Sequence, residues 1–90
     1  MTATSLPTHP DGQITTYRDF HEREQTSVDG PKGRVLITRG DRFDPYEVWH
    51  SDQLTTIATT SDHGHAIRAA CMAAGLDVKR LDYSAVGAGH

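Results

Sequence analysis

The stretch Leu54–Leu76, LTTIATTSDHGHAIRAACMAAGL, constrains the fold most, because it has the pattern of a short strand followed by a capped, alanine-rich helix. Ser61 and Asp62 are good N-cap residues, since a short side-chain oxygen can accept hydrogen bonds from the free amides of the first turn. Gly75 stands where the left-handed residue that ends a helix is expected. The sequence therefore predicts a helix over residues 62–74.

The two sides of this helix differ in polarity. An apolar stripe at i, i+3, i+4 and i+7 consists of Ile67, Ala70, Cys71 and Ala74. The opposite side carries His65, Arg68 and Met72 at similar spacing. Because alanine side chains are small, the stripe favours a helix that lies close against a sheet.

The strands are predicted from β-branched and aromatic runs. The strongest is Arg34–Arg39, RVLITR, which stands between two glycines. Tyr46–His50 alternates in polarity and forms a hairpin with Leu54–Thr60 through a three-residue connection. Leu76–Tyr83 has the pattern of a last strand.

The N-terminal third is more polar. Gln13–Phe20 is compatible with a strand or with the start of a helix through Glu24, and its β-branched residues favour the strand. The polar run His21–Gly33 contains Asp-Gly-Pro and is expected to be a loop. Together these patterns predict an α+β fold, with a small antiparallel sheet of three to four strands packed on one helix. Residues 1–12 are expected to be a flexible tail, 13–85 a single domain and 86–90 a frayed C-terminus.

Composition sets the class of protein. The chain has 90 residues, a net charge of -3 and one cysteine, so no intrachain disulfide is expected and a reducing compartment is indicated. There is no apolar run near the ~20 residues of a membrane span, and the N-terminus lacks the pattern of a signal peptide. We expect a soluble, cytoplasmic protein without a membrane partner.

The residues that could carry chemistry do not form a known motif. His63 and His65 stand about 160° apart around a helix, and Cys71 lies about two turns beyond His63, so they do not converge on one metal ion. Cys71 is also far from the helix N-terminus that would stabilise a thiolate. The sequence therefore predicts no catalytic residue, no metal ligand and no cofactor.

The leading functional hypothesis is a non-enzymatic binding or regulatory protein that acts through protein–protein contact, either self-association as a homodimer or binding of a partner. The expected contact surfaces are the hairpin Tyr46–Thr60 and the polar side of the helix. The candidate residues are Tyr46, Trp49, His65, Arg68 and Met72.

The alternative is nucleic-acid binding, in one of two forms. Aromatic side chains of the sheet could stack on single-stranded bases beside Arg34, Arg39 and Arg42. Segment 66–84 also has a spacing similar to a helix-turn-helix, which would present Lys79 and Arg80 to DNA. The negative net charge disfavours both forms.

Overall fold

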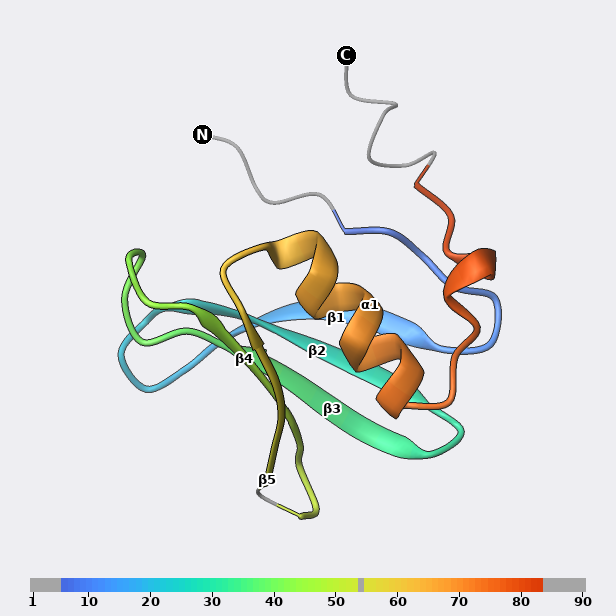
Figure 1. Cartoon of the computed structure of the whole chain (residues 1–90), viewed down its shortest axis with the longest axis horizontal. Helices are drawn as coiled ribbons and strands as arrows, with labels where there is room; N and C mark the ends of the chain where they lie inside the picture. Colours follow the sequence, from blue (N-terminus) through green and yellow to red (C-terminus); the bar gives the residue numbers. More distant parts are fainter. Residues whose placement is uncertain (1–5, 54, 84–90) are drawn as a thin grey trace.

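The structure is a computed structural model that describes residues 6–53 and 55–83. Within these residues, five strands form one antiparallel sheet in the order β1-β2-β3-β4-β5, and one α-helix lies across it (Figure 1). The elements are β1 (Gln13–Arg18), β2 (Glu24–Gly30), β3 (Gly33–Thr38), β4 (Tyr46–His50), β5 (Thr55–Thr60), α1 (His63–Ala73) and the short 3-10 helix η1 (Val78–Arg80). No helix in the described part of the chain is long and apolar enough to cross a membrane.

The α+β class and the single helix on an antiparallel sheet are confirmed, but the sheet has five strands and not three to four. The missed strand is β2, which lies inside the run expected to be a loop. Its sequence, EQTSVDG, has one large apolar residue, Val28, which is paired with Ile14 on β1 and with Val35 on β3. A polar segment becomes a central strand here because its neighbours on both sides satisfy its backbone hydrogen bonds.

Both ends of α1 are capped as the sequence predicts. The Asp62 carboxylate accepts hydrogen bonds from the backbone N–H groups of Gly64 (2.8 Å) and His65 (3.3 Å). Gly75 has φ +85°, and the N–H of Leu76 donates to the carbonyl of Cys71 at 2.8 Å. This is the hydrogen-bond pattern of a Schellman motif.

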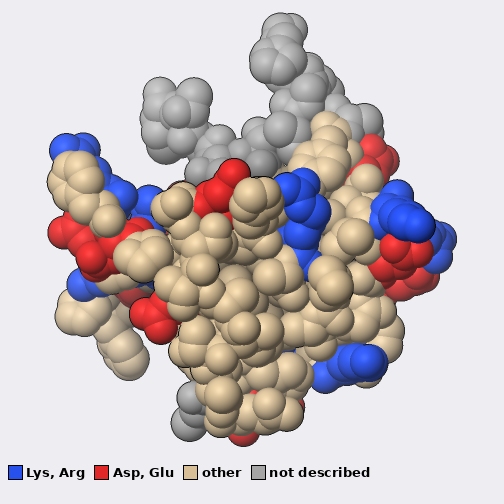
Figure 2. Space-filling model, viewed as in Figure 1, with Lys and Arg blue, Asp and Glu red and all other residues tan. Residues whose placement is uncertain are grey.

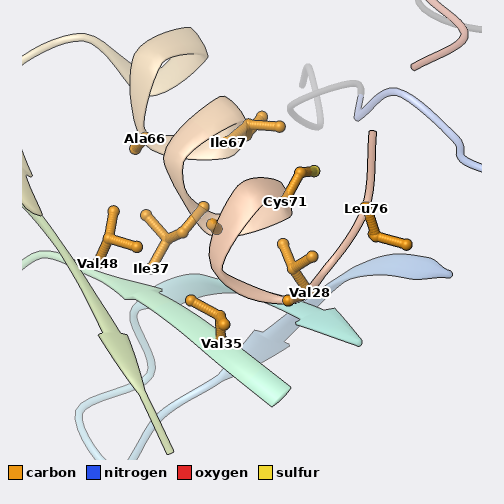
Figure 3. Packing of buried hydrophobic residues seen from close by; sticks show 10 residues of the cluster. Val28, Val35, Ile37, Val48, Ala66, Ile67, Cys71 and Leu76 are labelled. Atoms are coloured by element: carbon orange, nitrogen blue, oxygen red, sulfur yellow. The ribbon is translucent and has the colours of Figure 1, made fainter. Parts of the chain in front are cut away.

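The core lies between α1 and the middle of the sheet (Figure 3). Val28, Val35, Ile37 and Val48 extend from β2, β3 and β4 toward the helix and are buried. The predicted stripe faces them: Ile67, Ala70, Cys71 and Ala74 are buried together with Ala66. Small residues on the helix thus meet branched residues on the sheet.

Residues 76–83 differ from the predicted last strand. After Gly75 the chain forms η1, whose N-cap Asp77 accepts from the N–H of Lys79, and then makes a single bridge in which Asp82 pairs with Thr8. A three-residue 3-10 helix is not a recognition helix, so the helix-turn-helix over 66–84 is not formed in the described residues. The physical reason is that this segment pairs with the N-terminal segment instead of extending the sheet.

Residues 6–12, expected to be part of a flexible tail, pack against the domain. Pro7 and His9 are buried, and Arg80 forms an ion pair with Asp11 at 2.6 Å. His9 donates from Nε2 to the Asp77 carbonyl at 2.9 Å and accepts at Nδ1 from the Asp11 N–H at 3.0 Å. Residues 86–90 lie outside the described part of the chain.

We predict that Ile37→Val lowers the free energy of unfolding by about 0.5–1.5 kcal/mol, because it leaves a methyl-sized void in a packed core. Ile37 is 1% exposed, whereas Ile57 on β5 is 45% exposed. The matched control Ile57→Val should therefore change the free energy of unfolding by less than about 0.5 kcal/mol. Urea unfolding followed by circular dichroism measures both, and equal losses would contradict this core.

We predict that His9→Ala destabilises the protein by about 1–3 kcal/mol, because a buried ring with two hydrogen bonds is lost. His21 lies exposed in the β1–β2 loop, so His21→Ala is the matched control and should have little effect. Urea unfolding of both variants tests this. If His9→Ala were as stable as the wild type, the N-terminal segment would not be part of the folded domain.

Candidate functional site

The two faces of the sheet have different surroundings. Helix α1 contacts β2, β3, β4 and β5 from one side only, and η1 contacts α1. We call the other side the open face; by strand alternation it carries Thr15, Tyr17, Ser27, Asp29, Arg34, Leu36, Thr38, Glu47 and Trp49. No described helix covers it. An uncovered sheet face is a candidate contact surface.

The centre of the open face is apolar. Leu36 on β3 and Trp49 on β4 are directly opposite each other in the register, and Trp49 Nε1 donates to Thr38 Oγ1 at 3.0 Å. With Tyr17 and the fully exposed Phe20 they line an open groove of about 580 Å³. A second hollow of about 440 Å³ shares Tyr17 and Leu36 with the first. The two hollows therefore make one continuous surface.

The charges of the open face lie around this centre and have both signs. Arg34 Nε forms an ion pair with Asp29 Oδ1 at 2.8 Å, and Glu47 stands opposite Thr38. Burial, and to a lesser extent the nearby Asp19 carboxylate, raises the pKa of Tyr17, so its phenol is uncharged at neutral pH. The face thus combines an apolar centre with a balanced polar rim.

The five residues predicted to contact a partner do not form one surface. Trp49 lies on the open face, whereas Tyr46 lies on the helix side of the sheet, where its ring contacts the ring of His63. His65, Arg68 and Met72 lie on the exposed side of α1, and Met72 is 66% exposed. The structure therefore divides them among three places.

The residues of the nucleic-acid alternative are also separated. Arg34 is paired with Asp29 on the open face, and Arg39 lies at the end of β3 on the helix side. Arg42 stacks on Phe43 in the β3–β4 loop, and Lys79 and Arg80 belong to η1. On the helix side, Lys and Arg are interspersed with Asp and Glu among the described residues and do not gather into one patch (Figure 2).

A polar cavity of about 210 Å³ lies at the N-terminal end of α1, and we call it the helix-side pocket. Its lining residues are Thr16, Glu24, Gln25, Thr26, Ile37, Arg39, Tyr46 and His63. The Arg39 guanidinium lies 4.4 Å from the centre of the Tyr46 ring, and this ring lies 4.9 Å from that of His63. His63 Nε2 is 3.4 Å from Thr26 Oγ1.

His63 is kept neutral by its surroundings. Burial lowers its pKa, and the positive charge of Arg39 lowers it further, while the Asp62 carboxylate acts in the opposite direction. At neutral pH the imidazole is therefore an uncharged hydrogen-bonding group. Arg39 supplies the positive charge of the helix-side pocket.

Cys71 lies in the core, on the side of α1 that packs on the sheet. It is fully buried, and burial raises the pKa of its thiol to about 11. In the described residues, no three His, Cys, Asp or Glu side chains stand close enough to hold a metal ion together.

Compared with models of known protein families, with curated proteins and with solved structures, the chain shows no significant match. Its function is therefore inferred from its own geometry.

Sequence reasoning missed Phe20 and Leu36 on the open face, and Thr16, Thr26 and His63 as pocket residues. One signal was present for Leu36. It stands between Val35 and Ile37, and a continuous apolar run in a strand places apolar side chains on both faces of the sheet. The pocket residues come from separate strands, so no local spacing indicates them.

We predict that the imidazole of His63 titrates below the ~6.5 of an ordinary histidine, as measured by NMR. Arg39→Gln removes the cationic neighbour and should raise this pKa. Because the unfolded chain binds the proton at higher pH than the folded one, the free energy of unfolding should fall as pH drops through the window just below 6.5. An unchanged His63 titration in Arg39→Gln would contradict the proximity of the two groups.

Proposed function

We propose that this chain is a small non-enzymatic binding or regulatory protein that acts by protein–protein contact, with the open face pairing with a second copy of itself. The observation that supports this most is the apolar centre formed by Tyr17, Leu36 and Trp49 on a sheet face without a covering helix. Such a surface gains free energy when it is removed from water. Of the two surfaces predicted from the sequence, the hairpin Tyr46–Thr60 contributes Trp49 to this proposed interface, and the polar side of α1 is not part of it.

The apolar centre and the mixed-charge rim of the open face suit a second copy as its partner. In a two-fold symmetric dimer each patch meets itself, so an apolar centre faces an apolar centre and a rim of both signs avoids net repulsion. The ion pair of Arg34 with Asp29 neutralises one part of this rim within each chain. A face-to-face pair would be two sheets about 10 Å apart with both helices outside.

The open face is also large enough for a dimer interface. The molecule measures 33 × 31 × 20 Å, and the sheet lies in its two long dimensions (Figure 1). A standard interface uses about 800 Å² of each partner, which a face of this extent can provide. The single cysteine, buried in the core, suits a reducing compartment, and we propose a cytoplasmic location on that ground.

Nucleic-acid binding is the second candidate, because Tyr17, Phe20 and Trp49 are aromatic and line one groove. Stacking on such side chains is the usual way that a sheet binds single strands. However, Arg34 on this face is already paired with Asp29, and Arg18, which lines the groove, donates to the Glu22 carbonyl and shares the groove with the Asp19 carboxylate. Self-association needs no cationic surface, so it is preferred.

We predict that the wild-type chain is a dimer in sedimentation equilibrium and that Leu36→Glu weakens the dimer at least about tenfold, because a carboxylate would be buried in the apolar centre. Met72→Glu is the matched control, since it places the same charge on the exposed side of α1. It should leave the dimer unchanged. Circular dichroism verifies that both variants are folded.

Other results of these measurements would contradict the proposed interface. Dissociation by Met72→Glu but not by Leu36→Glu would move the interface to the helix side. A monomeric wild type at all concentrations would overturn self-association. A monomer that shifts the anisotropy of a labelled oligothymidine at low salt, but not at high salt, would favour nucleic-acid binding.

A further inference from the structure

We propose that the helix-side pocket is a binding site for a small carboxylate ligand, held by Arg39 with the hydroxyl groups of Thr16, Thr26 and Tyr46. This site is separate from the open face, because the four side chains proposed to hold the ligand belong to positions in or directly after the strands, on the opposite side of the sheet. It therefore goes beyond self-association and can be tested whether or not the protein is a dimer.

The first support is unused hydrogen-bonding capacity that converges on one cavity. Arg39 donates from Nη1 to the Arg42 carbonyl and stacks on Tyr46, but it has no carboxylate partner among the described residues. Within the same part of the chain, the hydroxyls of Thr16 and Tyr46 have no hydrogen-bond partner, and the contact of Thr26 with His63 is long at 3.4 Å. The Arg39 guanidinium and these hydroxyl groups can therefore donate hydrogen bonds to a ligand oxygen.

The second support is that the pocket holds its arginine in place. The stacking of Arg39 on the Tyr46 ring restricts the long side chain, so less conformational freedom is lost when a ligand binds. The planar guanidinium can then present two parallel N–H groups, which match the two oxygens of a carboxylate. Tyr46 in turn is packed on His63 at the start of α1.

Charge selects a carboxylate over a phosphate. The pocket has one cation, Arg39, because burial and Arg39 itself keep His63 neutral. Glu24 lines the same cavity and would repel an anion of charge near two. Because Glu24 repels a dianion more strongly than a monoanion, a single negative charge that binds directly to the Arg39 guanidinium is favoured over a double one. The amides at the start of α1 are not needed, since Asp62 already accepts from Gly64 and His65.

Binding should be coupled to His63. The charged or titratable groups around it are Arg39, which directly follows β3, Tyr46 from β4, Glu24 from β2 and its own N-cap Asp62. A bound carboxylate would offset the field of Arg39, so protonation of His63 becomes easier and its pKa rises. Ligand binding would thus take up a proton at mildly acidic pH.

The test is an NMR titration of the full chain with sodium acetate, with sodium chloride and sodium phosphate at equal ionic strength as parallel arms. Acetate should shift the signals of Thr26, Arg39 and His63 with millimolar half-saturation, as expected for so small a ligand. It should also raise the pKa of His63. The variant Arg39→Gln should weaken the response at least tenfold, whereas Arg42→Gln, a neighbouring arginine that does not line the pocket, should retain it.

Three results would overturn the proposal. Phosphate binding without acetate binding would show that the charge argument is wrong. Equal responses to acetate and chloride would show only ionic-strength effects. Retained acetate binding in Arg39→Gln, with the rest of the spectrum unchanged, would remove Arg39 from the site.

Discussion

The rest of the structure depends on the close contact between α1 and the sheet. The helix presents small side chains such as Ala66 and Ala70, so its backbone can approach the branched residues of β2, β3 and β4. The C-terminal end of α1 is hydrogen-bonded to the β2–β3 turn, where the N–H of Lys32 donates to the Ala74 carbonyl at 2.9 Å. A Cβ on Gly30 would lie 2.4 Å from that carbonyl oxygen, so a side chain at this position would separate the helix from the turn.

This one-sided packing creates both proposed binding surfaces. Because a single helix seals only one face, Leu36 and Trp49 stand on a face that remains available for contact. Helix α1 begins at His63 and does not cover the nearby ends of β2, β3 and β4. Polar side chains line the pocket at this place, where a longer helix would pack on core residues. A large apolar face and a small polar pocket thus follow from the length and position of one helix.

Sequence reasoning worked where the signal is local. The N-cap Asp62, the left-handed Gly75 and the buried stripe are confirmed, because capping and helical periodicity depend on residues a few positions apart. The hairpin of β4 with β5 and the strand β3 are confirmed for the same reason. By contrast, β2 is polar, and its extended shape depends on pairing with β1 and β3 on either side. The 3-10 turn after Leu76 likewise depends on contacts with residues 6–12, which are distant in sequence.

The sequence by itself determined the α+β class, one capped helix with an apolar stripe, and the alternation that places Trp49 and Val48 on opposite faces of β4. It also contains the aromatic and basic residues that could bind a partner or nucleic acid, but it does not show which of them lie together. Only the tertiary structure decided that Arg39, Tyr46 and His63 line one pocket while Leu36 and Trp49 share the open face. The physical reason is that helix caps and side-chain periods are set by neighbouring residues, whereas a binding surface is set by the register between strands and by which face the helix covers.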